Sequence, residues 1–328
     1  MALEKKTSIF YILEILKKYS DENHYLLYSD IIKLLNDNYG LILERKTIAT
    51  HIDILSSIGY DIVKHGKNGL YLRERTFDNG ELLFLIDSIY SSKSMPTRYA
   101  YDLVEKLMAD YSQYEQKKYN NLEKLDDGVR SDNKQLFYTI EILNEAIELK
   151  KKVEFQYNSY GLNKKFTPKD NGKIYKISPY FMVNNRGKYY VICNYDKYND
   201  LSNYKIECIS EIKILDEDAK NIKDLDGCND FSLKQYMNEH IYMTYGDSVE
   251  AKIKINSKNY INDFIDWYGK KANITETNEG IIARVKVNEG ALIYWSLQYG
   301  ENVEVLEPTT TRNKIREKLK YILDKYND

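Results

Sequence analysis

Apolar residues recur at helical spacing through the first 60 residues of the chain. Residues 5–19 place Ile, Leu and Phe three and four positions apart, which predicts an amphipathic helix. A second helix is predicted with Ser29 as its N-cap and Gly40 at its end. A third is predicted from Glu44 or Arg45 to Ser57, followed by Gly59 as a C-terminal stop. Its inward face is expected to contain Ile48, Ile52, Ile54, Leu55 and Ile58.

A short hairpin is predicted after these helices. Residues 60–63 and 70–73 have strand character, and Asn68-Gly69 between them is a strong turn signal. Three helices and a hairpin within about 75 residues predict a winged helix-turn-helix, whose third helix enters the major groove of DNA. Polar residues on that helix and hairpin are therefore candidate contacts to bases and phosphates. They are Arg45, Lys46, Thr47, Thr50, His51, Lys64, His65 and Lys67.

The charge of this N-terminal part leaves an alternative open. Residues 1–76 hold eleven Lys/Arg and ten Asp/Glu, a small excess for a DNA-binding module. The basic residues are concentrated on the third helix and the hairpin, which favours DNA binding. The alternative is a module that binds another protein, with the same side chains as ordinary surface.

Helical patterns continue beyond this part. Asp78 or Asn79 is expected to cap a helix over 80–91, and Pro96 to begin another that ends near Tyr114. Residues 115–133 are highly charged and poor in core residues, which predicts a helical connector that ends in a linker. A further helix is predicted over 131–149.

A strand-rich stretch at 177–209 differs from the rest of the chain in charge and aromatic content. It predicts strands over 177–183, 188–195 and 204–209, with a turn at 184–187 and a polar loop at 196–203. Residues 153–157 predict the first strand of the same sheet, and 161–176 a basic, flexible excursion. Residues 150–213 hold 13 Lys/Arg, 6 Asp/Glu and nine tyrosines, while the whole chain has a net charge of −2.

A basic sheet with interleaved aromatic residues suits a phosphate-bearing ligand, because lysines neutralise phosphates and rings stack on bases. The alternative is a small β-barrel with a tyrosine-rich core and a solvated lysine surface.

Three runs in this stretch resemble the WYL domain. They are Pro179-Tyr180, Gly187-Lys188-Tyr189-Tyr190-Val191 and Tyr204-Lys205-Ile206-Glu207-Cys208-Ile209. Tyr189-Tyr190-Val191 stands where that family has Trp-Tyr-Leu. The last run stands where the family has an aromatic-Arg-aliphatic-Asp-Arg-aliphatic sequence. Lys205 and Glu207 roughly keep the chemistry of the family residues, whereas Cys208 replaces an arginine that could bind phosphate with two hydrogen bonds.

The resemblance implies an Sm- or SH3-like β-barrel that senses a nucleotide or a nucleic-acid ligand. Tyr190, Lys205 and Glu207 are candidate ligand contacts by their motif positions. Tyr157, Ser178 and Tyr180 are candidates by their places in the strands, and Arg186 and Lys188 are expected near the rim.

The C-terminal part has the predicted order β-α-β-β-α-β, which is the ferredoxin-like pattern. The runs at 294–300 and 303–308 resemble the C-terminal extension that follows many WYL domains. From Ile214 onward the net charge is −4, which disfavours DNA binding. A dimerisation role, a lid over the ligand and a purely structural cap all remain open.

Sequence motifs of common enzymes are missing. HExxH, GxSxG, Walker A and GxGxxG stretches do not occur, and His24, His51, His65 and His240 lack metal-site spacing. We therefore expect no catalytic residues, no cofactor and no metal site. The three cysteines form no CxxC pair, which favours the reducing cytoplasm. No apolar run is long enough to span a membrane, and the N-terminus has no signal-peptide pattern.

Taken together, the sequence predicts a multidomain α+β protein. The expected parts are a winged helix-turn-helix (1–76), a helical connector (77–132), a WYL domain (133–220), a linker (221–247) and a ferredoxin-like extension (248–328). This order resembles bacterial regulators with a DeoR-like winged helix, which implies a homodimer that binds an inverted-repeat DNA operator. The alternatives are an RNA- or single-strand-binding accessory protein of a CRISPR or other phage-defence system, and a protein–protein adaptor.

Overall fold

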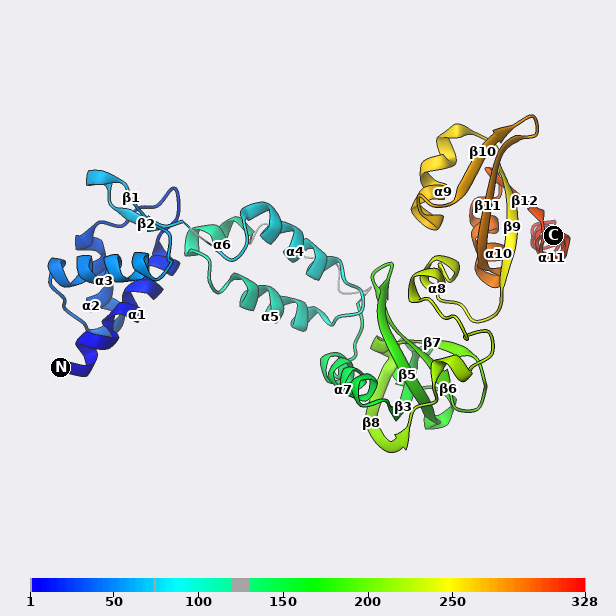
Figure 1. Ribbon diagram of the computed structural model, residues 1–328, viewed down its shortest axis with the longest axis horizontal. Coiled ribbons are helices and arrows are strands. Elements are labelled where there is room, and N and C mark those ends of the chain that lie inside the picture. The colour runs from blue at the N-terminus through cyan, green and yellow to red at the C-terminus, as the bar shows by residue number, and fades with distance from the viewer. Residues whose placement is uncertain (1, 74, 120–129, 328) are drawn as a thin grey trace. The chain divides into compact units, whose positions relative to one another are not determined.

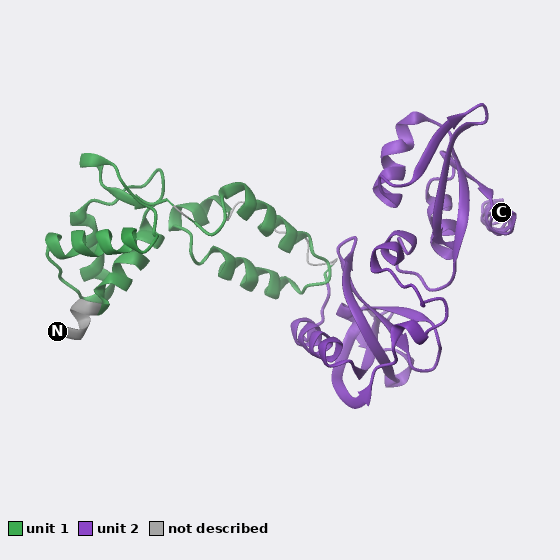
Figure 2. Cartoon of the chain, viewed as in Figure 1, with its two compact units in different colours: residues 1–130 green, residues 131–328 purple. Residues whose placement is uncertain are grey.

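The computed structural model describes residues 2–73, 75–119 and 130–327, apart from the side chains of residues 2–6. It divides into two compact units, Met1–Arg130 and Ser131–Asp328 (Figure 2). Both combine helices with antiparallel sheets, so the expected mixed α/β composition is confirmed (Figure 1). The finer division into five parts stays a prediction, and residues 120–129 of the expected connector lie outside the described residues.

The first unit begins with three helices and a hairpin. These elements are α1 (Ala2–Tyr19), α2 (Tyr28–Tyr39), α3 (Arg45–Ser57), β1 (Ile62–Lys64) and β2 (Leu70–Leu72). Their core is formed by aliphatic residues at helical spacing, including Ile12, Leu16, Ile31, Ile48 and Ile52. At Gly69 the hairpin backbone approaches the backbone of Leu26 closely. A Cβ there would lie 2.6 Å from the Leu26 carbonyl oxygen, so this position requires glycine.

Three details of this part differ from expectation. The N-cap of α2 is Leu27 rather than Ser29, and the Leu27 amide donates to the Asp30 carboxylate. Ile54 and Ile58 are exposed, because the face defined by Ile48, Ile52 and Leu55 already fills the contact with the neighbouring helices. The hairpin turn also contains a short 3-10 segment, Gly66–Asn68, so it is wider than a two-residue Asn-Gly turn.

Three more helices complete the first unit: α4 (Asn79–Ser91), α5 (Thr97–Met108) and α6 (Gln113–Tyr119). Asp78 caps α4 as expected, in a reciprocal capping box with Glu81. The helix expected to reach Tyr114 ends instead at Met108. A separate helix, α6, then begins after a reciprocal capping box. The Ser112 hydroxyl accepts from the Glu115 amide, and the Glu115 carboxylate accepts from the Ser112 amide.

The second unit opens with a helix and six strands. They are α7 (Leu136–Leu149), β3 (Lys151–Tyr160), β4 (Phe166–Pro168), β5 (Ile174–Asn185), β6 (Lys188–Tyr195), β7 (Leu201–Lys205) and β8 (Ile209–Asp218). The strand order is β4-β3-β5-β6-β7, and β8 pairs with β3. Thus β3 has partners on both sides, and its buried residues Val153 and Phe155 lie in the interior.

Two expectations for this sheet are corrected. The excursion at 161–176 contains β4, which pairs with β3. The single strand expected at 204–209 is divided into the end of β7, a 3-10 turn at Ile206–Cys208 and the start of β8. Ile206 and Glu207 are consecutive and both buried, which a strand with one solvent-facing side does not allow.

The segment expected as a linker at 221–247 is folded. It contains α8 (Leu233–Glu239) and buries Leu225, Cys228, Ile241 and Met243. These apolar residues are spaced irregularly, so no helical or strand period announces them.

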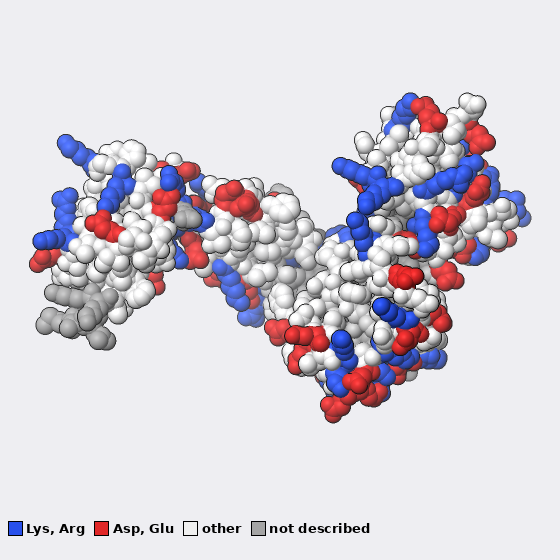
Figure 3. Space-filling model, in the orientation of Figure 1, with Lys and Arg blue, Asp and Glu red and all other residues white. Residues whose placement is uncertain are grey.

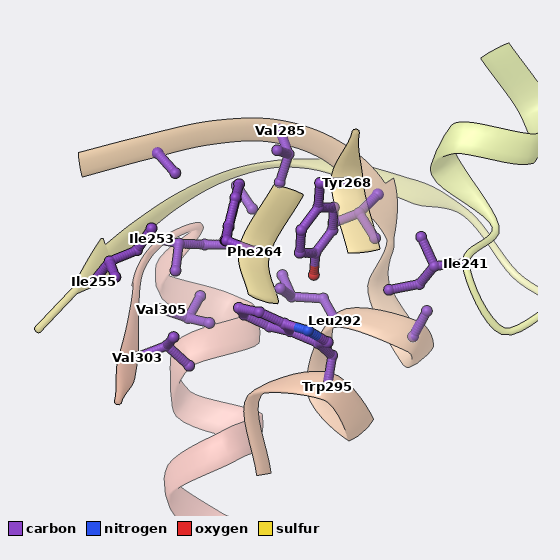
Figure 4. Packing of buried hydrophobic residues seen from close by; sticks show 14 of the residues in the cluster. Ile241, Ile253, Ile255, Phe264, Tyr268, Val285, Leu292, Trp295, Val303 and Val305 are labelled. Atoms are coloured by element: carbon purple, nitrogen blue, oxygen red, sulfur yellow. The ribbon is translucent and has the colours of Figure 1, made fainter. Parts of the chain in front are cut away.

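The C-terminal part follows the predicted order of elements. They are β9 (Ser248–Ile255), α9 (Ile261–Tyr268), β10 (Asn273–Thr277), β11 (Gly280–Asn288), α10 (Glu289–Gln298), β12 (Val303–Glu307) and α11 (Thr309–Asp324). The sheet order β10-β11-β9-β12 places β9 and β11 at the centre. Trp295 of α10 is 1% exposed and packs against Phe264 and Tyr268 (Figure 4). No helix among the described residues is long and apolar enough to cross a membrane.

Replacing Trp295 tests this core. Trp295→Ala is expected to lower the free energy of unfolding by about 3–5 kcal/mol, because a large buried ring leaves a cavity. Trp267 and Trp295 are the only tryptophans of the chain, so in this variant Trp267, which lies in α9, is the fluorescent probe of unfolding in urea. The control is Tyr294→Ala on the same helix, which is 64% exposed and should cost less than about 0.5 kcal/mol. Equal urea midpoints for the two variants would contradict the packing described.

Candidate functional site

The N-terminal end of α3 presents several of the predicted DNA contacts to solvent. Arg45, Lys46 and Thr50 are exposed, and Thr47 is half-buried. The Thr50 hydroxyl donates to the Lys46 carbonyl at 3.0 Å. The Arg45 guanidinium lies 5.1 Å from the centre of the Tyr28 ring, so α2 orients it. This end of the helix therefore offers two cations with accessible donors.

The hairpin carries the other predicted contacts, Lys64, His65 and Lys67, all exposed. Lys64 lies 2.7 Å from the Asp53 carboxylate of α3, and this hydrogen bond raises the pKa of Lys64. An open groove of about 720 Å³ separates the hairpin from α2 and the start of α3. Arg45, Lys64 and Lys67 line it. Figure 3 shows acidic side chains interspersed with basic ones on the visible face of this unit, in keeping with its small net charge.

His51, another predicted DNA contact, makes a contact within the N-terminal part. Its Nε2 lies 3.0 Å from the Ser8 hydroxyl of α1, and the ring is half-buried. The position next to Ile52 on the inward face explains this contact. The ring connects α3 to α1 through this contact. In this position it is poorly placed to contact a DNA base.

Five of the eight predicted ligand residues come together in the six-stranded sheet of the second unit. Tyr190 of β6 pairs with Lys205 of β7, and the Tyr157 hydroxyl accepts from the Lys205 amide at 3.3 Å. The Lys188 ammonium lies 3.1 Å from the Glu207 carboxylate. The sequence motif thus defines a single cluster at the junction of β6, β7 and the 3-10 turn.

Glu207 is the most unusual member of this cluster. It is 4% exposed, and neither carboxylate oxygen has a hydrogen-bond partner. Its one ion pair among the described residues is with Lys188. A buried carboxylate with unfilled acceptor capacity is costly, so a donor from a ligand would be stabilised there.

Cys208 and Tyr157 add donors to the same cluster. Burial raises the pKa of the Cys208 thiol and of the Tyr157 phenol, so both are protonated at neutral pH. The cluster therefore combines two ammonium groups, a thiol, two phenols and one carboxylate. It can bind a ligand that has both an anionic part and hydrogen-bond donors.

Ser178 and Tyr180 lie at a different place. The Lys220 amide donates to the Ser178 hydroxyl at 3.0 Å, and the Tyr180 hydroxyl donates to the Lys220 carbonyl at 2.9 Å. Tyr180 and Lys220 line a cavity of about 600 Å³, which Ile147 and Ile222 border. Sequence reasoning missed Lys220, because it follows the last strand of the barrel and belongs to no motif.

Arg186, which was expected near the rim of the ligand site, contacts the C-terminal part. Its guanidinium carbon lies 3.4 Å from the centre of the Trp267 ring, and it donates to the Asp266 carbonyl at 3.1 Å. Arg186 and Gly187 both have positive φ, the geometry of a two-residue hairpin turn. This turn directs the arginine onto α9.

The tyrosines of the barrel mostly pack on one another. Tyr157 and Tyr204 have ring centres 5.2 Å apart, and Tyr175 lies 5.7 Å from Tyr204 and is buried. Of the nine tyrosines in residues 150–213, Tyr175 is buried, Tyr160 and Tyr198 are exposed and the other six are half-buried. The rings therefore lie between core and surface, and both interpretations of the aromatic content stay open. No group of three His, Cys, Asp or Glu residues within the described chain is placed to hold a metal ion.

A comparison with protein families identifies the part of the chain that contains this sheet. Residues 138–214 match the model of the WYL domain. The chain contains a WYL domain. The matched range runs from α7 into β8 and includes the whole cluster around Glu207.

Comparisons with solved structures give two further similarities. Proteasome accessory factor B/C (PafBC) of Arthrobacter aurescens is 14% identical with a TM-score of 0.29, and the match covers 99% of this chain and 49% of that one. A CRISPR Cas-related protein is 16% identical with a TM-score of 0.38, covering 98% of this chain and 85% of that one. Both TM-scores are too low to support an argument. No curated protein matches the chain.

The ion pair of the WYL cluster can be tested by a double-mutant cycle. Lys188→Ala leaves the Glu207 carboxylate buried and unpaired, so we expect a loss of about 1–3 kcal/mol in unfolding free energy. Combining it with Glu207→Gln should restore most of that loss. Urea unfolding would be followed by circular dichroism, with tryptophan fluorescence monitoring the C-terminal part separately.

Lys213→Ala is the matched control for this cycle, because Lys213 is 67% exposed in its ion pair with Glu154 and that carboxylate keeps more contact with solvent than Glu207. Its cost should stay below about 1 kcal/mol. Additive effects of Lys188→Ala and Glu207→Gln would show that the two groups do not interact.

Proposed function

We propose that this protein is a DNA-binding transcriptional regulator whose WYL domain senses a nucleotide or a nucleic-acid ligand. The observation that carries the proposal is the WYL domain in one chain with three helices and a hairpin that expose Arg45, Lys46 and Thr50. Burial of these three side chains would have removed the means of reading DNA. We assign the N-terminal part to the DeoR-like winged helix-turn-helix class.

The remaining architecture follows from the same proposal. The strands of the WYL domain form an Sm- or SH3-like barrel, and the C-terminal sheet is a ferredoxin-like extension. The regulator acts in the cytoplasm as a homodimer on an inverted repeat, with one α3 helix in each half-site. It has no enzymatic activity and needs no cofactor.

Regulation in this proposal is a shift between two arrangements of the dimer. A ligand changes operator affinity only if it binds the two arrangements with different affinity. A difference of about 1–3 kcal/mol would alter operator occupancy by roughly 5- to 150-fold. The cluster of Lys188, Tyr190, Lys205 and Glu207 is the proposed ligand contact, with Tyr157 behind it.

A second candidate is an RNA- or single-strand-binding accessory protein of a phage-defence system. The distribution of charge favours it, because residues 150–213 have a net charge of +7 while residues 1–76 have only +1. In this case the barrel is the working surface and the N-terminal part binds a partner.

Selection of duplexes from a random DNA pool at about physiological salt separates the two candidates, since nonspecific phosphate binding is weakened there. The regulator should enrich an inverted repeat. Lys46→Ala should weaken binding to it by about 1–3 kcal/mol, as for a lost base or phosphate contact. Lys106→Ala on α5 removes the same charge from an exposed site elsewhere and should have no effect. Retention of single strands without duplex enrichment would favour the accessory protein.

Lys205→Ala tests the ligand site. The variant should keep the operator affinity of the full chain and lose affinity for a labelled short single-stranded oligonucleotide, because one phosphate partner is missing. Fluorescence anisotropy measures both. Lys213→Ala is the control, a lysine of the same barrel outside the cluster. If both variants bind the oligonucleotide like the wild type, the cluster is not the ligand site.

A further inference from the structure

A second cavity, of about 510 Å³, lies where the start of β7, the folded segment at 221–247 and β11 meet. Its size is within the range of small-molecule sites. Acidic side chains dominate its lining: Asp200, Asp226, Glu239 and Asp247, against the one basic residue Lys286. This is the opposite of the basic barrel.

The walls of this cavity are held by hydrogen bonds between its three parts. The Tyr245 hydroxyl donates to the Asp200 carboxylate at 2.6 Å, and Asn203 and Tyr236 exchange hydrogen bonds at 2.8 and 3.1 Å. The Thr244 hydroxyl lies 2.8 Å from the Asn288 side-chain oxygen. The cavity is therefore a built feature of the fold.

Two buried polar atoms on this lining have no hydrogen-bond partner. His240 is 7% exposed, and its Nδ1 makes no hydrogen bond. Burial lowers the pKa of His240 to about 4, so the ring is neutral and offers one N–H donor and one acceptor nitrogen. The second carboxylate oxygen of Asp200, Oδ1, is likewise buried and unpaired. Buried polar atoms are normally hydrogen-bonded, so their lack of partners points to a donor that is not part of this chain.

The carboxylates of the lining indicate that the missing donor belongs to a positively charged group. Lys286 lies 3.1 Å from Glu239 and offsets that one carboxylate, which leaves Asp200, Asp226 and Asp247 without a cationic partner in the cavity. Within the described residues the acidic groups do not converge on a point as metal ligands do. Acidic groups spread around a cavity instead suit an extended cation with several N–H donors.

We propose that this cavity binds a small organic cation carrying ammonium or guanidinium groups. The site shares no residue with the WYL cluster, so it stands whether or not the barrel senses a nucleotide. Asp200 and His240 supply the buried acceptors, and Asp226 and Asp247 supply negative charge at the opening.

Calorimetric titration of the full chain tests the proposal with 1,4-diaminobutane, spermidine and agmatine as probes. At least one should bind with one site per chain. The uncharged analogue 1,4-butanediol should give no binding. Mg²⁺ in equal concentration should not displace the amine. The amine donates N–H hydrogen bonds to the buried acceptors, and Mg²⁺ has no such donors.

Two variants remove the acceptors. Asp200→Asn keeps an oxygen for the Tyr245 hydroxyl but loses the charge, and His240→Phe keeps a ring without nitrogen. Each should weaken amine binding by about tenfold or more, as for a lost hydrogen bond to a charged group. Asp224→Asn, an exposed carboxylate outside the lining, should bind like the wild type. Asp200→Asn nearly preserves volume, so it provides the test even if His240→Phe fails to fold.

Three results would overturn the proposal. They are the absence of binding by all three amines, equal affinities of Asp200→Asn and Asp224→Asn, and displacement of the amine by an equal concentration of Mg²⁺. The last would reveal general attraction of cations to an acidic surface.

Discussion

The buried guanidinium of Arg75 is the constraint on which the first unit depends. Its side chain is 8% exposed and donates to the Ser20 carbonyl at 2.7 Å, while its Nε lies 3.5 Å from the Glu115 carboxylate. A buried charge is tolerated only when it is paired and hydrogen-bonded, so α1 and α6 must keep their positions around it. The Ser112 hydroxyl adds a bond to the buried carboxylate of Asp21. The group of helices to which α3 belongs, with Arg45 and Lys46, is thereby fixed to the helices that follow it.

The WYL cluster, which consists of Tyr157, Lys188, Tyr190, Lys205, Glu207 and Cys208, also contains a buried charge. The carboxylate of Glu207 is less completely satisfied than the guanidinium of Arg75. Glu207 has an ion pair with Lys188 but no hydrogen bond, and it is held by its backbone. The Asn133 side chain donates to the carbonyls of Glu207 and Ile209 at 3.0 and 2.7 Å, which fixes the turn between β7 and β8. Such a carboxylate is destabilised relative to a fully satisfied one, and a ligand that supplies donors would remove that cost. Cys208 next to Glu207 adds a protonated thiol, which is a neutral donor and brings no positive charge to the cluster.

Local pattern predicted most elements and failed where distant residues decide the structure. The periodicity of Ile48, Ile52 and Leu55 defines α3, and the turn signal at Asn68-Gly69 defines the hairpin. The turn at Ile206–Cys208 was missed because Asn133, far away in sequence, holds it. Arg186 was placed at the ligand rim because nothing near it in sequence indicates the contact with Trp267. For the same reason the segment at 221–247 gave no sign of its fold, since its apolar residues pack without a regular period.

For the proposed function, these features set the physical terms on which a ligand would be coupled to DNA. Because Arg75 fixes the N-terminal helices to α6, a movement of the later helices of the first unit carries α3 with it. If the junction were flexible, a movement caused by ligand binding would not be transmitted to α3, however tightly the WYL domain bound the ligand. The sensing step needs the opposite property, an incompletely satisfied group whose energy changes when a ligand arrives. Glu207 has this property and Arg75 does not, so the chain places its rigidity next to the proposed DNA-reading helix and its unsatisfied charge in the WYL domain.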